Sequence, residues 1–333
     1  MTSPGKSGTP APNVDFIYAP VQAQLDQVVD ELRNLAGHAK LSGEEGLLEH
    51  AVVSGGKKVR PTVTLLAGAL RDGPQDKLVT MATAVELLHI ASLVHDDTVD
   101  RAETRRGKAT ISSMWGNDVA VLLGDYVFAT SATFVCDTGN LQVVRRFSET
   151  IMELAQGELA EYFSTHDWSQ TIGDYTERIY KKTASLFCTA SEAGGVLSDA
   201  PAEECEALSQ YGYNLGMAFQ IMDDVLDFMG TEEELGKPVG ADLLQGTLTL
   251  PVLLFAAQNP KHPDVKRVVE GSIEPEHLQA IVELVRGSSV IDQAISAMDG
   301  YKQATLDALT RVPKHRARES LEALTEFVSQ RRV

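Results

Sequence analysis

Two short acidic runs in the sequence have the residue types and spacing to hold a cation. Residues 96–100 read Asp-Asp-Thr-Val-Asp and residues 223–227 read Asp-Asp-Val-Leu-Asp, and each run closes a mainly apolar segment. On a helix, residues four apart lie about 40° apart around the axis, so the first and last aspartates of each run share a face. Such carboxylates repel each other unless a cation lies between them, and hard oxygen ligands suit Mg²⁺ that bridges to phosphate. A solvated acidic helix end is the alternative for either run alone, but two copies favour a magnesium site.

Basic residues that could bind a phosphate occur near these runs. Residues 55–61, Gly-Gly-Lys-Lys-Val-Arg-Pro, combine two glycines that permit close backbone approach with Lys57 and Arg60 as anion ligands. Other basic residues follow the first acidic run or belong to a Lys-Lys-Thr triplet: Arg105, Arg106, Lys181 and Lys182. Each group alone is also typical of an exposed turn or a solvated surface. Together with the acidic runs, they indicate a diphosphate site.

Two further polar side chains lie at helical spacing from the runs. His89 precedes Asp96 by two helical turns, so we expect it on nearly the same face. Gln220 lies about one turn before Asp223, where its amide could contact substrate or orient a carboxylate. A lone histidine on an apolar helix is more often a core residue, and neither side chain is decisive by itself.

The elements that position these residues are predicted to be helices. Apolar residues recur at helical spacing after residue 15, and no comparable strand alternation occurs. The predicted helical segments are 21–32, 79–95, 117–135, 141–163, 173–192, 203–228, 249–257, 276–285 and 318–331. Glycine- and proline-rich turns separate them without a long linker. The pattern predicts one all-α domain over residues 14–333, a helical bundle, preceded by a disordered tail of residues 1–13.

The composition argues against several function classes. There are 47 acidic and 29 basic residues, and the net charge of −18 disfavours binding to nucleic acid or to an anionic membrane surface. Glu86, His89 and His95 interrupt the most apolar segment, so we do not expect an integral membrane protein. The three cysteines, Cys136, Cys188 and Cys205, lack metal-ligand spacing and are typical of a reducing compartment, which predicts a cytoplasmic location.

Several segments resemble the trans-isoprenyl diphosphate synthases in order and spacing: GGKKVRP, ELLHIASLVHDDTVDRAETRRG, YKKTASLF, FQIMDDVLD and GKPVGADL. The resemblance covers nearly the whole chain after the tail. It implies the isoprenoid synthase fold, a bundle around a deep central cavity with the acidic runs facing each other across its mouth, and generally a homodimer. It also implies Mg²⁺-dependent joining of isopentenyl diphosphate to an allylic diphosphate, namely dimethylallyl, geranyl, farnesyl or geranylgeranyl diphosphate.

The resemblance assigns a role to each matching residue. Magnesium would be bound by Asp96, Asp100 and Asp223, with neighbouring carboxylates from Asp97, Asp224 and Asp227. The leaving diphosphate would be stabilised by Arg105, Lys182 and Lys237. Isopentenyl diphosphate would be held by Lys57, Arg60, His89 and Arg106. The allylic cation would be surrounded by Thr183 and Gln220.

Product length in this family depends on side chains below the first acidic run. Ala91 and Ser92, five and four residues before Asp96, are small, whereas short-chain members usually carry a large residue there. We therefore expect the growing chain to pass this level and to reach Leu88 one turn deeper. The resemblance is to synthases of medium and long all-trans chains, with candidate tunnel floors at Phe128, Phe134 and Phe147.

Three alternatives stay open from the sequence. The chain could be a short-chain farnesyl or geranylgeranyl diphosphate synthase, which Ala91 and Ser92 disfavour. It could be a non-catalytic subunit of a heteromeric synthase, although such subunits typically have degraded acidic runs. A class I terpene cyclase would not need the GGKKVRP segment. One departure from the family pattern is Thr247, where a lysine is frequent, and it leaves open how the diphosphate site closes.

Overall fold

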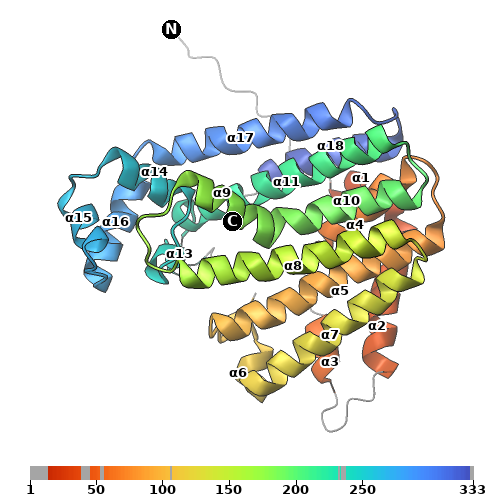
Figure 1. Ribbon diagram of the computed structural model, residues 1–333, viewed down its shortest axis with the longest axis horizontal. Helices are drawn as coiled ribbons and strands as arrows, with labels where there is room; N and C mark the ends of the chain where they lie inside the picture. The colour runs from red at the N-terminus through yellow and green to blue at the C-terminus, as the bar shows by residue number, and fades with distance from the viewer. Residues whose placement is uncertain are drawn as a thin grey trace.

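The computed structural model describes residues 14–38, 46–52, 56–105, 107–231, 233 and 238–330. The predicted tail, Arg106 and Lys237 lie outside these residues. Within them, helices form nearly all of the regular structure (Figure 1). The α-helices are α1 (Val14–Tyr18), α2 (Gln22–His38), α3 (Leu47–Val52), α4 (Val59–Ala69), α5 (Gln75–Val99), α6 (Ile111–Trp115), α7 (Asn117–Asp137), α8 (Leu141–Phe163), α9 (Ile172–Ile179), α10 (Ser185–Leu197), α11 (Ala202–Met229), α13 (Ala241–Leu244), α14 (Leu250–Gln258), α15 (Pro263–Val269), α16 (Pro275–Arg286), α17 (Val290–Leu309) and α18 (Arg316–Ser329).

Two short helices of other types and one β-hairpin lie between the α-helices in the described part of the chain. A 3₁₀-helix, η1 (Ala19–Val21), joins α1 to α2, and a π-helix, η2 (Tyr180–Ala184), joins α9 to α10. An antiparallel hairpin of β1 (Thr104–Arg105) and β2 (Lys108–Ala109) follows α5. The hairpin is too short to produce the alternation by which a strand is recognised in a sequence.

The all-α prediction is confirmed, and every predicted helical segment overlaps an observed helix, although 318–331 extends beyond the end of α18. The segment 173–192 is not one helix, because η2 divides it into α9 and α10. The apolar spacing did not predict the longer helices α4 and α17, nor the short helices α1, α3, α6, α13 and α15. Eight residues of α4 are buried, so it has no clear polar face and no amphipathic stripe.

Two groups of buried apolar side chains form the core. The first joins α1–α8 and α10 to the N-terminal half of α11 and to α18, and the second joins the C-terminal half of α11 to α9, α13–α17 and η2. The long helix α11 therefore passes through both groups, and α17 packs along it (Figure 1). Every residue of α5 from Met81 to Leu87 is buried, so the helix that carries the first acidic run is fixed in the core.

Two of the described helices, α5 and α7, are long and apolar enough to cross a membrane by length and composition alone. In the most apolar 18-residue stretch of α5, 72% of the residues are buried inside the protein, as in the core helix of a globular domain. The corresponding share for α7 is 33%, because one face of that helix is exposed. The three cysteines are free, and Cys188 is buried, where burial raises the pKa of its thiol to about 12 and keeps it unreactive.

Candidate functional site

The first acidic run lies at the C-terminal end of α5. Asp96 is half-buried, Asp97 is buried, and Asp100 is the exposed residue that caps the helix. The Oδ1 atom of Asp97 accepts a hydrogen bond of 2.6 Å from Nε of Arg105 on β1. This bond ties the hairpin to α5. Asp96 and Asp100 are then the two carboxylates of the run that lie one helical turn apart, as the spacing predicts.

Lys182 brings two further carboxylates to this run. Its Nζ atom lies 2.6 Å from Oε1 of Glu161 and 3.0 Å from Oε1 of Glu158, both near the end of α8. Burial alone would lower the pKa of Lys182, but the charges of Glu161, Glu158 and Asp96 raise it above its usual value. Lys182 is therefore a permanent cation among acidic groups.

The carboxylates around Lys182 carry more negative charge than it can neutralise. Burial and the charge of Glu158 raise the pKa of Asp96 well above its usual value. Asp100 is exposed, but the surrounding protein removes part of its solvent, and this desolvation, with the charge of Glu161, raises its pKa as well. A raised carboxyl pKa means that the ionised form lacks stabilising partners. The cluster therefore favours binding of additional positive charge.

The second acidic run is near the C-terminal end of α11. Asp223 is half-buried, whereas Asp224 and Asp227 are buried. Asp227 accepts a hydrogen bond of 3.3 Å at Oδ2 from the backbone N–H of Asp242. Asp224 accepts bonds from the Tyr175 hydroxyl at 2.6 Å and from Gln220 Nε2 at 2.9 Å.

The pKa of Asp224 is raised despite these hydrogen bonds. Complete burial, with the nearby charges of Asp242 and Asp223, raises its pKa to about 8, and the bonds from Tyr175 and Gln220 offset only part of the shift. Because Asp224 is buried between helices, Asp223 is the more accessible carboxylate of the run.

A hydrogen-bond chain links the second run to the π-helix. The Thr183 hydroxyl donates to Oε1 of Gln220 at 2.7 Å, and Gln220 Nε2 donates to Asp224. Thr183 follows Lys182 directly, so neighbouring residues of η2 contact the surroundings of both acidic runs. The prediction grouped Thr183 and Gln220, and the structure brings them into contact.

The π-helix packs unusually close to α8. A Cβ atom on Gly157 would lie 2.8 Å from the backbone nitrogen of Lys182, a distance that a side chain does not tolerate. Only glycine at this position lets η2 approach the helix that carries Glu158 and Glu161. Single π turns within helices are frequent at functional sites.

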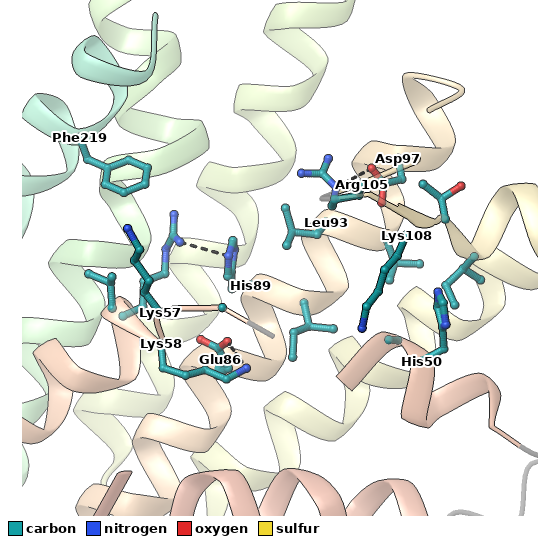
Figure 2. Close-up of a pocket in the computed structure, with 18 of the residues that line it drawn as sticks. His50, Lys57, Lys58, Glu86, His89, Leu93, Asp97, Arg105, Lys108 and Phe219 are labelled. Carbon is teal, nitrogen blue, oxygen red and sulfur yellow. Dashed lines mark hydrogen bonds and ion pairs between the residues drawn. The ribbon is translucent and has the colours of Figure 1, made fainter. Parts of the chain in front are cut away.

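A cavity of about 560 Å³ lies beside the first acidic run. Figure 2 shows Lys57, Lys58, Glu86 and His89 gathered on one side of it and Asp97, Arg105, Lys108 and His50 on the other. Its wall thus carries basic residues from α4, α5 and the β1–β2 hairpin, together with apolar side chains. Such a cavity fits a small ligand with an anionic head and an apolar body.

The predicted anion ligands Lys57, Arg60 and His89 all line this cavity. Nη1 of Arg60 lies 3.2 Å from Nε2 of His89, and the guanidinium lies 4.6 Å from the centre of the Phe187 ring. Nζ of Lys57 lies 4.7 Å from the centre of the Phe327 ring. The aromatic faces restrict the flexible basic side chains, which lowers the entropy cost of binding an anion.

The residues predicted to control chain length differ in accessibility. Leu88 and Ala91 are fully buried in the first core group, whereas Ser92 is half-buried and its hydroxyl donates to the carbonyl of His89 at 2.9 Å. Ser92 thus reaches accessible space on the face that carries His89. Phe147 is buried among core side chains, and the ring of Phe128 packs against His95.

Sequence reasoning missed several residues of the site. The pair Glu158 and Glu161 could have been found from its three-residue spacing on the amphipathic segment 141–163. The Lys58–Glu86 pair, Tyr175, His50 and Lys108 follow no local pattern, because they meet their partners only through tertiary packing. Thr247 is half-buried and its backbone N–H donates to the carbonyl of Asp242 at 2.8 Å.

The donors of the acidic runs fit a hard divalent cation. They are all carboxylate oxygens, which Mg²⁺ prefers. Among the described residues, no three His, Cys, Asp or Glu side chains converge closely enough to enclose a metal ion by themselves. Mg²⁺ usually keeps several waters and binds one or two carboxylates together with substrate phosphates, so this open arrangement suits it.

Comparisons with known proteins agree with this geometry. The family model described as Polyprenyl synthetase matches residues 45–285. Heptaprenyl diphosphate synthase component 2 of Bacillus subtilis is 37% identical over 316 residues, which cover 95% of this chain and 90% of that protein. A Caulobacter crescentus polyprenyl synthase, solved in complex with calcium and isoprenyl diphosphate, superposes with a TM-score of 0.89 at 33% identity, over 98% of this chain and 100% of that one. A geranylgeranyl pyrophosphate synthetase from Pyrococcus horikoshii gives a TM-score of 0.84 at 32% identity, over 95% and 98% of the two chains.

Proposed function

Because the chain belongs to the polyprenyl synthetase family, we propose that it condenses isopentenyl diphosphate with an allylic diphosphate to form an all-trans polyprenyl diphosphate. The observation that carries the proposal is the position of η2. Lys182 joins the carboxylates around Asp96, and Thr183 joins the second run through Gln220, next to a cavity lined by basic residues.

The cavity is the proposed site of isopentenyl diphosphate. Lys57, Arg60 and His89, with Arg106 outside the described residues, would bind its diphosphate, and the apolar part of the wall would hold its five-carbon body. Two fixed aromatic contacts orient the basic groups before the substrate arrives. Such orientation lowers the barrier by holding the double bond next to the reacting carbon.

The acidic runs are the proposed site of the allylic diphosphate. Asp96, Asp100 and Asp223 would hold Mg²⁺, with Asp97, Asp224 and Asp227 as supporting carboxylates. When bound, Mg²⁺ would neutralise charge on the leaving diphosphate. Arg105 and Lys182, with Lys237 outside the described residues, would stabilise the same charge as the C–O bond breaks.

The remaining residues act on the carbon skeleton. Thr183 and Gln220 direct hydroxyl and amide oxygens toward one another beside Lys182 and would surround the allylic cation with polar groups. The terminal alkene carbon (C4) of isopentenyl diphosphate would then bond to C1 of the allylic cation, which leaves the positive charge on C3 of the isopentenyl unit. Loss of a proton from C2 to the departed diphosphate would form the new C2=C3 double bond. The product is an allylic diphosphate longer by one isoprene unit.

We further propose a medium or long product. Ala91 and Ser92 are small, and the Bacillus subtilis relative is named for a heptaprenyl product. Geranylgeranyl synthase is the alternative, because a protein of that name shares the fold closely. Synthases with the same fold can make products of different length. The side chains below the first acidic run are the feature expected to determine that length.

A homodimer is the proposed assembly. The packed helices α7 and α8 expose several large apolar side chains, which a second copy would cover: Val121, Leu122, Tyr126, Met152, Leu159, Tyr162 and Phe163. The relative's name also marks it as one component of a synthase, so a different subunit is the competing partner. Light scattering of the purified chain should give twice the chain mass, whereas the mass of a monomer would favour a different subunit as the partner.

Incorporation of radiolabelled isopentenyl diphosphate tests the proposed function. The purified chain, supplied with Mg²⁺ and farnesyl diphosphate, should form product soluble in organic solvent. No incorporation with any of the four allylic primers would contradict the proposal for this chain alone and would favour a non-catalytic or heteromeric subunit.

A further inference from the structure

Two cross-links join the first turn of α4 to α5 on the wall of the cavity. One is the contact between Arg60 and His89, and the other is an ion pair in which Lys58 Nζ donates to Glu86 Oε1 at 2.9 Å. Glu86 and His89 lie three residues apart on one side of α5, so the cross-links are neighbours (Figure 2). The first consists of proposed substrate ligands, and the second has no role in the reaction described above.

The Lys58–Glu86 pair is largely withdrawn from solvent. The side chain of Lys58 is 14% exposed and that of Glu86 is 8% exposed. A buried carboxylate without a cationic partner is strongly unfavourable, so loss of either residue leaves the other in an unfavourable environment. The pair is therefore formed whenever α4 and α5 are packed as observed.

The backbone of Lys58 adopts an uncommon conformation. Lys58 has φ 48° and ψ 39°, the left-handed region that residues other than glycine rarely adopt. Its carbonyl accepts from the Thr62 hydroxyl at 2.7 Å, and the carbonyl of Lys57 accepts from the Tyr18 hydroxyl at 2.6 Å. The turn is held from both sides, and the Glu86 contact holds the side chain at its centre.

This turn determines where the two proposed ligands point. Lys57, before the left-handed residue, reaches Phe327 of α18, whereas Arg60, after it, reaches Phe187 of α10. A change in the dihedral angles of Lys58 would move these cationic groups relative to each other. Their spacing must match the two phosphates of one diphosphate.

We propose that Glu86 is a positioning residue for the isopentenyl diphosphate site and acts through Lys58. Its carboxylate fixes the Lys58 side chain, which keeps the turn in the left-handed conformation and holds Lys57 and Arg60 at the spacing that a diphosphate requires. The inference rests on the proposed function of the cavity. It assigns the Lys58–Glu86 pair to substrate positioning rather than to general stability.

Steady-state kinetics of Glu86→Gln and Lys58→Met test this role. Each variant should raise the Michaelis constant for isopentenyl diphosphate about tenfold, while the constant for the allylic primer and kcat change by less than about twofold. The double variant should be no worse than either single variant, because both remove the same contact. Glu204→Gln, which breaks the ion pair with Arg71 away from the cavity, is the matched control and should leave all constants unchanged.

Lys58→Gly removes the ion pair without adding backbone strain. Glycine adopts the left-handed region without strain but adopts other regions as readily, so nothing holds the turn in one conformation once the contact with Glu86 is lost. It also keeps the proposal testable if Glu86→Gln does not fold. We expect the same rise in the Michaelis constant for isopentenyl diphosphate.

Two outcomes would overturn the inference. One is a normal Michaelis constant in Lys58→Gly and Glu86→Gln, and the other is an equal loss for both substrates accompanied by a lower Tm, as a purely structural pair would give. Either result requires an active wild type. An inactive wild type would instead contradict the proposed function, so the two failures are distinguishable.

Discussion

Lys182 on η2 lies between Glu158 and Glu161 of α8, with Nζ 3.0 and 2.6 Å from their carboxylate oxygens. This contact places a cation at the level of Asp96, where burial and neighbouring charge raise the pKa of the carboxyl. Without substrate, Lys182 therefore limits repulsion among acidic groups. In the proposed reaction, the same ammonium group would stabilise the leaving oxygen of the allylic diphosphate.

When Lys182 is replaced by a neutral residue, added Mg²⁺ should restore stability but not activity. Lys182→Met leaves the carboxylates of Glu158 and Glu161 unneutralised, so in EDTA the free energy of unfolding should fall by about 1–3 kcal/mol. Mg²⁺ should restore most of the Tm, because it replaces the lost positive charge, but it should not restore kcat. Thermal unfolding with and without Mg²⁺ measures this, and an unchanged Tm in EDTA would contradict the electrostatic account.

Asp96→Asn should lower kcat about a thousandfold and leave the binding of isopentenyl diphosphate nearly unchanged, because Asp96 belongs to the proposed metal site and not to the cavity. Asp76→Asn, an exposed aspartate in the first turn of the same helix, is the control and should be fully active. Turnover by Asp96→Asn within a few-fold of wild type would remove Asp96 from the catalytic group.

Arg60→Ala should raise the Michaelis constant for isopentenyl diphosphate at least about tenfold, and more than that for the allylic primer, because Arg60 lies in the cavity beside His89. Arg33→Ala, an exposed arginine of α2, should change neither constant. The reverse order of effects would mean that the two diphosphate sites have been exchanged.

A large ring below the first acidic run should shorten the product. Ser92→Phe enters accessible space, whereas Ala91→Phe must enter a filled core and should cost about 1–3 kcal/mol of stability. Both folded variants should remain active and should make farnesyl or geranylgeranyl diphosphate, as measured by chromatography of the dephosphorylated products. An unchanged product from both would show that the chain takes another route.

The stability of the metal-free protein should fall as pH rises. Burial raises the pKa of Asp224 to about 8, whereas an aspartate in the unfolded chain has its ordinary value of 3.8, so between these values only the folded state retains the proton. The stabilisation is complete below the lower value and decreases by up to about 1.4 kcal/mol per pH unit until the upper one. In EDTA, the Tm should decrease from pH 5 to 8, and Asp224→Asn should show a smaller slope. A Tm that rises over this range would contradict the assignment.

The sequence predicted most of the long helices and the two acidic runs because both are local patterns. Amphipathic spacing located α8, and the four-residue spacing indicated a shared face for Asp96 and Asp100. The π-helix was not predicted, since the single glycine that permits its approach, Gly157, lies on another helix. The Lys58–Glu86 pair also depends on packing between helices, because its members are 28 positions apart along the chain. Such contacts have no local signature.

Product sizing with the purified chain tests the central claim most directly. Radiolabelled isopentenyl diphosphate is incubated with farnesyl diphosphate and Mg²⁺, and the dephosphorylated products are separated by length beside those of Asp96→Asn and of a reaction in EDTA. We predict an all-trans ladder that ends beyond the geranylgeranyl length with wild type, at most a trace of product with Asp96→Asn, and no product in EDTA. A wild type that stops at geranylgeranyl diphosphate would contradict the proposed length, and equal product in EDTA would contradict the metal-dependent condensation itself.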